Sequence, residues 1–162
     1  MFKDKTIWIT GGSSGIGEAL ALQFASRGAR IVLSARRNDE LNRVRDACIG
    51  QGLSSENVLV LPLDVTDFES MPAAVTRVCD AYGHIDMLIN NAGISQRSLC
   101  IDTEMTVYRK LFDVDVLGQI ALTKAVLPLM LERRSGHIVI TSSVAGKMGS
   151  PSALATAPRS MR

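Results

Sequence analysis

A glycine-rich run near the start of the chain has the composition of a phosphate-binding turn. It reads Thr10-Gly11-Gly12-Ser13-Ser14-Gly15-Ile16-Gly17 and follows the apolar segment Thr6-Ile7-Trp8-Ile9. Glycines permit a sharp turn, let the backbone approach a pyrophosphate, and let the next helix pack closely on the sheet. The N–H groups and positive dipole end of that helix would face the phosphates. We therefore predict a nucleotide site at Gly11, Ser13, Ser14, Gly15, Ile16 and Gly17. The alternative is an ordinary strand–helix turn.

A pair of arginines stands where a second strand should end. In dinucleotide-binding folds, a carboxylate at this place binds the ribose 2′-hydroxyl and repels a 2′-phosphate. This chain has Ala35 there, followed by Arg36 and Arg37. Guanidinium groups pair well with phosphate and stack on adenine. The pair favours NADP(H) over NAD(H), unless the two arginines are only solvated loop residues.

The elements that must position these residues alternate along the chain. Continuous apolar runs of the kind found in parallel strands buried on both faces predict strands over 6–10, 30–35, 57–63, 87–90 and 137–142. Helices are expected over 15–27, 39–50, 68–82 and 104–133, with Asp67 as the cap of the third and Pro128 kinking or dividing the fourth. This alternation predicts an α/β fold with a doubly wound parallel sheet.

Four motifs occur in an order that resembles the short-chain dehydrogenase/reductase family. They are the TGxxxGxG pattern of the glycine-rich run, Asp64-Val65, Asn90-Asn91-Ala92-Gly93 and Ser142-Ser143, and the resemblance extends from Lys3 to about Ala155. It implies a Rossmann fold. It also implies that Asp64 and Val65 contact the adenine, that Asn91 braces the central sheet, and that Ala92 and Gly93 line the ribose and nicotinamide side.

The same resemblance implies a catalytic set of serine, asparagine, tyrosine and lysine. A tyrosine titrates near 10 and needs a nearby cation to transfer a proton near neutral pH. Ser143 matches the family serine, and Asp115 stands at the asparagine position. Thr156 and Ser160 stand where the tyrosine and lysine should be. We therefore expect the chain to be inactive as it stands, with a catalytically dead nucleotide-binding or interaction module, or a nonfunctional gene fragment, as alternatives.

The last residues admit a hypothesis about the gene. One T restored before the Thr156 codon turns any threonine codon into the tyrosine codon TAC, and one allowed spelling then gives a lysine four residues later. This would make 156–162 an out-of-frame tail. Residues 1–162 would be a single NAD(P)-binding domain, truncated before the Tyr/Lys helix and the substrate lid. The last strand and one face of the long helix would then be uncovered, which favours aggregation. The sequence of the encoding DNA tests this hypothesis.

Composition narrows the remaining function classes. Charge is nearly balanced, at +2, which argues against nucleic acid as a partner. The cysteines, Cys48, Cys79 and Cys100, show no metal-binding spacing and are expected to be thiols in a reducing compartment. We expect a cytoplasmic protein without a membrane segment. The resemblance further implies a small alcohol or carbonyl substrate, similar to those of hydroxysteroid dehydrogenases and related carbonyl reductases, and a family that is usually homo-oligomeric.

Overall fold

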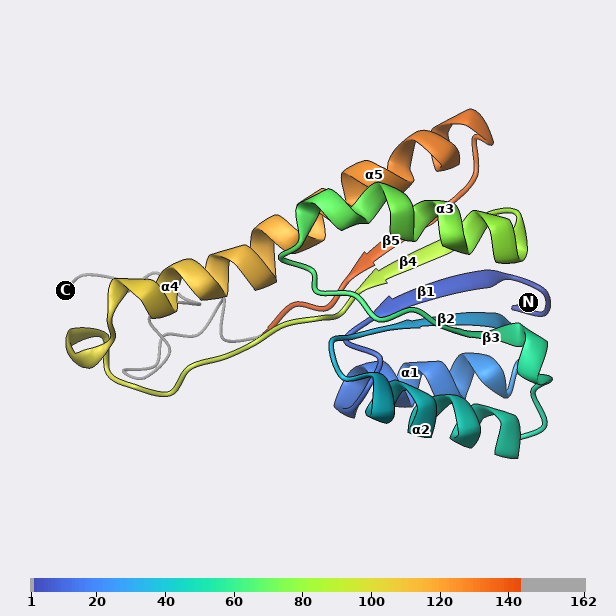
Figure 1. Cartoon of the computed structure of the whole chain (residues 1–162), viewed down its shortest axis with the longest axis horizontal. Coiled ribbons are helices and arrows are strands. Elements are labelled where there is room, and N and C mark those ends of the chain that lie inside the picture. The colour runs from blue at the N-terminus through green and yellow to red at the C-terminus, as the bar shows by residue number, and fades with distance from the viewer. Residues whose placement is uncertain (1, 144–162) are drawn as a thin grey trace.

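Five parallel strands form one sheet. The computed structural model describes residues 2–143. The strands are β1 (Thr6–Thr10), β2 (Arg30–Ser34), β3 (Val58–Val60), β4 (Met87–Asn90) and β5 (His137–Ile140). Their order in the sheet is β3-β2-β1-β4-β5 (Figure 1). The chain winds outward from β1 to β3 and then returns to place β4 on the other side of β1. The predicted doubly wound parallel sheet is confirmed, and its ligand-binding switch point lies between the carboxyl ends of β1 and β4.

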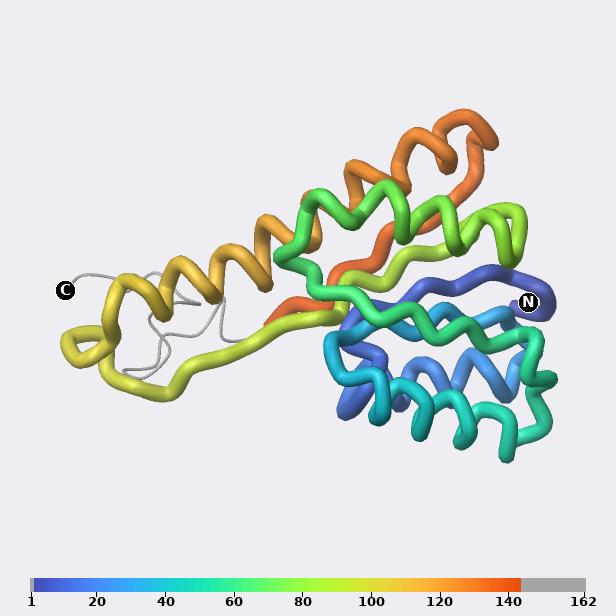
Figure 2. Tube along the Cα trace, viewed as in Figure 1, coloured from blue at the N-terminus to red at the C-terminus, as the bar shows by residue number. Residues whose placement is uncertain are grey.

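Helices cover both faces of the sheet (Figures 1 and 2). One face carries α1 (Gly15–Ala25) and α2 (Asn38–Gly50), and the other carries α3 (Met71–Tyr82) and α5 (Gly118–Glu132). Successive side chains of a strand point to opposite faces. Accordingly, Ile7 and Ile9 belong to the core formed with α1 and α2, while Trp8 belongs to the core formed with α3 and α5. All three are fully buried.

The longest helix is continuous but irregular in its middle. It consists of α4 (Met105–Phe112), a π-helical turn over Asp113–Leu117, and α5. Our expectation that Pro128 divides this helix was wrong, because α5 continues through Pro128 to Glu132. The irregular hydrogen bonding lies at the π turn instead. By length and composition, this 28-residue helix could cross a membrane, although it packs on the sheet through buried Leu122, Val126 and Met130.

The observed ends of β3 and the start of α3 differ from the predicted ones. The regular part of β3 is shorter than 57–63, but Leu61 and Leu63 still donate backbone hydrogen bonds to Leu33 and Ala35. The predicted third helix begins as a 3-10 turn over Phe68–Ser70, and two further 3-10 turns span Ser55–Asn57 and Cys100–Asp102. Asp67 occupies the N-cap position of that turn, as predicted, but its side chain makes no capping hydrogen bond. Its carbonyl oxygen accepts bonds from Ser70 instead.

Apolar side chains are exposed on β5 and on the long helix. β5 is an edge strand of the sheet, and Val139 and Ile140 are 41% and 57% exposed. On the helix, the large exposed apolar side chains are those of Met105, Val107, Phe112, Val116, Leu117, Ile120, Leu127 and Leu131. The expected uncovered strand and bare helix face are thus both present among the described residues.

Candidate functional site

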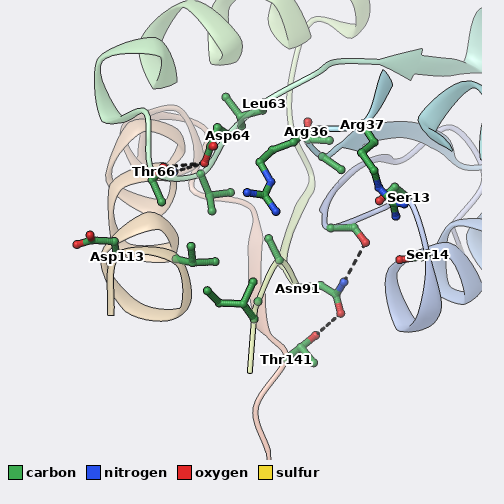
Figure 3. Close-up of a pocket in the computed structure, with 18 of the residues that line it drawn as sticks. Ser13, Ser14, Arg36, Arg37, Leu63, Asp64, Thr66, Asn91, Asp113 and Thr141 are labelled. Atoms are coloured by element: carbon green, nitrogen blue, oxygen red, sulfur yellow. Dashed lines mark hydrogen bonds between the residues drawn. The ribbon is translucent and has the colours of Figure 1, made fainter. Parts of the chain in front are cut away.

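A cavity of about 980 Å³ opens at the carboxyl ends of the strands (Figure 3). It lies at the switch point where open α/β sheets bind their ligands. Most of the residues predicted to bind a cofactor line it, namely Gly11, Ser13, Ser14, Ile16, Arg36, Arg37, Asp64, Val65, Asn91, Ala92 and Gly93. The fold therefore gathers residues from the segments that follow β1, β2, β3 and β4 around one space.

Gly15 and Gly17 shape the cavity wall without lining it. Gly15 begins α1 with φ +57°, and a Cβ added there would meet nothing within 4 Å. Gly17 is buried, and a Cβ added there would overlap the carbonyl oxygen of Gly11. The first turn of α1 can therefore lie against the end of β1 only because residue 17 is glycine.

Thr10, the last residue of β1, organises the centre of the site. Its Oγ1 accepts hydrogen bonds of 3.0 Å from the backbone N–H groups of Asn91 and Ala92. Asn91 Nδ2 donates to the carbonyl oxygen of Thr10 at 3.2 Å, and Thr141 Oγ1 donates to Asn91 Oδ1 at 3.0 Å. Figure 3 shows Asn91 and Thr141 joined in this way. Asn91 thus links the ends of β1, β4 and β5.

The arginine pair and Asp64 form the opposite wall. Arg36 and Arg37 are exposed and follow Ala35 at the end of β2, and Figure 3 shows Arg36 pointing into the cavity. Asp64 Oδ1 accepts hydrogen bonds from the backbone N–H and the hydroxyl of Thr66, at 2.9 and 2.8 Å. The bond from the Thr66 N–H is the main reason that the pKa of Asp64 is lowered. This wall therefore carries two cations and one ionised carboxylate at neutral pH.

The two predicted catalytic residues do not line the cavity. Asp115 lies in the π turn, and its Oδ1 accepts a hydrogen bond of 2.8 Å from the Ile94 N–H. Partial burial raises the pKa of Asp115, although this hydrogen bond opposes the rise. Ser143 is exposed, just beyond β5. The described residues therefore bring together the predicted cofactor site, but Thr156 and Ser160 lie outside them.

Sequence reasoning missed several residues of the site. Thr10 and Thr141 are hydroxyl residues at the carboxyl ends of β1 and β5, a position that could have marked them. Lys110 and Asp113, from the long helix, also line the cavity. No motif distinguishes these two from other charged residues on a helix.

Comparison with known proteins identifies the family. The sequence profile described as short chain dehydrogenase matches residues 5–155. The chain belongs to the short-chain dehydrogenase family. It is 51% identical over 149 residues to the human "Dehydrogenase/reductase SDR family member 7", covering 91% of this chain and 44% of that protein. The chain thus spans less than half the length of this curated relative.

Solved structures of the family agree in fold. A short-chain dehydrogenase/reductase from Caenorhabditis elegans, solved with cofactor, superposes with a TM-score of 0.89 at 30% identity, covering 96% of this chain and 59% of that one. A metagenomic short-chain oxidoreductase in complex with NADP gives a TM-score of 0.86 at 29% identity, covering 95% and 70%. Short-chain dehydrogenases bind NAD(P). The cavity suits such a dinucleotide because Gly11 leaves room for phosphates on one wall and Arg36 and Arg37 place positive charge on another.

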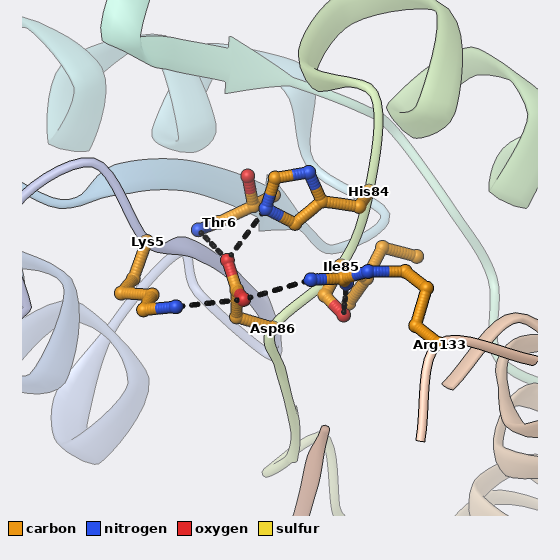
Figure 4. Close-up of polar contacts among 6 residues, drawn as sticks. All are labelled: Lys5, Thr6, His84, Ile85, Asp86 and Arg133. Carbon is orange, nitrogen blue, oxygen red and sulfur yellow. Dashed lines mark hydrogen bonds and ion pairs between the residues drawn. The ribbon is translucent and has the colours of Figure 1, made fainter. Parts of the chain in front are cut away.

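A second group of charged residues lies at the opposite end of the sheet (Figure 4). Asp86 precedes β4 and is 7% exposed. Its carboxylate contacts Lys5 Nζ at 3.2 Å, His84 Nε2 at 3.0 Å and Arg133 Nη2 at 3.4 Å.

Among residues 2–143, no group of three or more His, Cys, Asp or Glu side chains is placed to hold a metal ion.

Proposed function

We propose that this chain is the cofactor-binding portion of an NADP(H)-dependent oxidoreductase that interconverts an alcohol and a carbonyl. The observation that carries the preference for NADP(H) is the end of β2, where Arg36 and Arg37 line the cavity and residue 35 is alanine rather than a carboxylate. A 2′-phosphate would meet two guanidinium groups there and no opposing charge on residue 35. The NADP complex of the metagenomic relative is consistent with this proposal.

Each wall of the cavity has a separate task in this proposal. The N–H groups at the start of α1 bind the pyrophosphate, Arg36 and Arg37 bind the 2′-phosphate, and Asp64 and Val65 contact the adenine. Asn91 keeps Ala92 and Gly93 in position through the bonds to Thr10. When bound, the nicotinamide supplies or accepts the hydride. Ser143 would polarise the carbonyl oxygen of a small-molecule substrate.

We further propose that the chain binds the cofactor without turning over substrate. Proton transfer needs a group that titrates near the working pH. Thr156 and Ser160 cannot supply the phenol and the cation that the family uses. This favours a binding module as the second candidate function. Incubation with NADPH and a panel of small ketones tests it, because steady oxidation of NADPH would contradict it.

The cofactor preference is tested by titrating the chain with NADPH and NADH and following cofactor fluorescence. We expect tighter binding of NADPH, and a loss of about 10-fold or more in NADPH affinity in Arg36→Gln/Arg37→Gln. NADH affinity should change little. The matched control is Arg27→Gln, because the Arg27 guanidinium donates to Gln23 in α1 and lies away from the cavity. Equal affinities for the two cofactors in the unaltered chain would refute the preference.

A further inference from the structure

Arg43, on the second turn of α2, connects that helix to the glycine-rich loop and to α1. Its Nη1 and Nη2 donate hydrogen bonds to Oε1 and Oε2 of Glu18, at 2.8 and 2.9 Å. Nη2 also donates to the carbonyl oxygen of Ser13 at 3.3 Å, and Nε donates to Glu40 Oε2 at 2.9 Å. One guanidinium group therefore holds the glycine-rich loop, α1 and α2 together.

The positions of these partners relate Arg43 to the cavity. Ser13 lines the cavity and is 6% exposed. Glu18 lies in the first turn of α1, directly after the glycine-rich loop. α2 begins at Asn38, immediately after Arg37. Arg43 thus ties the loop that would bind the pyrophosphate to the helix that directly follows Arg36 and Arg37, although it does not itself line the cavity.

The charge of Glu18 gives this contact a second consequence. The hydrogen bonds from Arg43 are the main reason that the pKa of Glu18 is lowered, so Glu18 is ionised at neutral pH. An anion at the start of a helix is favourable by itself. However, it would repel a phosphate bound at the same helix end. The two-point contact with Arg43 neutralises the carboxylate and holds both of its oxygens toward α2.

We propose that Arg43 is a positioning residue for the cofactor: it tethers the glycine-rich loop through Ser13 and cancels the charge of Glu18, so that the loop accepts an anionic dinucleotide. This inference rests on the proposed function. Its first part, the tether, applies to the protein without cofactor, and its second part, the charge, applies to binding. The two parts can therefore be tested separately.

The tether is tested by hydrogen–deuterium exchange on the chain without cofactor. Arg43→Gln should raise the exchange rate of amides in residues 11–17 several-fold. Arg45→Gln is the matched control, because Arg45 lies on the same helix and, among residues 2–143, its guanidinium contacts Asp46 and Asn42 rather than the glycine-rich loop. Equal exchange in the two variants would overturn the tether, whether or not the chain binds NADPH.

The charge effect is tested by NADPH affinity. We expect Arg43→Gln to weaken binding about 10-fold, with Arg45→Gln unchanged. Glu18→Gln/Arg43→Gln should recover most of the lost affinity, because the uncompensated carboxylate at the start of α1 is gone and the remaining one, Glu40, lies on α2 rather than at the phosphate-binding helix end. A double variant as weak as Arg43→Gln would overturn the charge effect. Absence of NADPH binding to the unaltered chain would instead refute the proposed function, and the exchange experiment would still decide the tether.

Discussion

The backbone N–H of Thr6 donates a hydrogen bond of 2.9 Å to Oδ2 of Asp86, a residue 80 positions away in the chain. Thr6 begins β1 and Asp86 immediately precedes β4. This bond therefore fixes the amino ends of the two strands whose carboxyl ends form the centre of the site. The opposite ends of the same strands are joined by Thr10 and Asn91.

Asp86→Asn should destabilise the fold by about 1–3 kcal/mol at neutral pH, because the bonds from Thr6, Lys5 and Arg133 lose a charged acceptor. Urea denaturation measures this loss. NADPH affinity should be unchanged, because Asp86 lies away from the cavity.

The effect of Asp86→Asn should also depend on pH. Burial alone raises the pKa of Asp86, but the bonds from Thr6 and Lys5 and the nearby charges outweigh it, so the pKa is lowered. The stabilisation is thus present above the unfolded pKa of about 4 and is lost as the pH falls through the lower folded value. Urea curves for both proteins should converge in acid. A constant difference between pH 7 and about pH 3 would contradict this assignment.

Thr10→Val removes the acceptor for two backbone N–H groups and should cost about 1–3 kcal/mol of stability. It should also weaken NADPH binding, because Asn91 and Ala92 line the cavity. Thermal unfolding and cofactor titration measure the two effects. Thr76→Val is a matched control: Thr76 is exposed, and its hydroxyl donates to the carbonyl oxygen of Pro72 within α3. Similar losses in both variants would show that the hydroxyl of Thr10 has no special role.

Gly17→Ala should destabilise the protein and abolish measurable cofactor binding, because the new Cβ would overlap the Gly11 carbonyl oxygen and force α1 away from β1. Overpacking of this kind costs about 1–3 kcal/mol. Gly50→Ala has the opposite expectation, a gain of up to about 1 kcal/mol, because its Cβ would meet nothing within 4 Å at the end of α2. Calorimetry measures the unfolding of both variants. Similar changes in stability for Gly17→Ala and Gly50→Ala would show that the overlap at position 17 is not the cause.

Asp115→Asn should stabilise the protein at neutral pH. The pKa of Asp115 is raised, mainly by burial, so the folded state favours the protonated form. The associated stability is complete below the unfolded pKa and is lost as the pH rises through the higher folded value. Asparagine keeps an acceptor for the Ile94 N–H and carries no charge. The melting temperature of the variant should therefore exceed that of the unaltered chain at pH 7 and match it near pH 3. A lower melting temperature at pH 7 would mean that the ionised carboxylate is needed.

Leu131→Gln/Ile140→Thr should reduce association without reducing stability. The two side chains are 65% and 57% exposed, so their replacement removes apolar surface without opening a cavity. Light scattering during size-exclusion chromatography at increasing concentration should show a smaller associated fraction. Met130→Gln, at a 5% exposed neighbouring position, should instead unfold the chain. Unchanged association in the double variant would show that the exposed apolar side chains of α5 and β5 do not cause the association.

The sheet and most of the cavity wall could be predicted from sequence because their signals are local. A buried strand such as Thr6–Thr10 is a continuous apolar run, and the glycine-rich turn follows it directly. The π turn over Asp113–Leu117 was missed because a single wider turn shifts the apolar pattern of so long a helix too little to stand out in the sequence. The role of Arg43 was missed because its contacts reach Ser13 and Glu18, which are 30 and 25 residues away. Such contacts exist only after α1 and α2 have packed together.

The cavity wall extends along the chain from Gly11 to Thr141. No contiguous segment contains more than a fraction of it, and its central bonds close only when β1, β4 and β5 are side by side. A dinucleotide that binds there would bind the fully folded sheet and not its unfolded or partly folded states. Bound ligand would then shift the folding equilibrium of the whole sheet by mass action, so the melting temperature at rising NADPH concentration would report on assembly of the sheet as a unit.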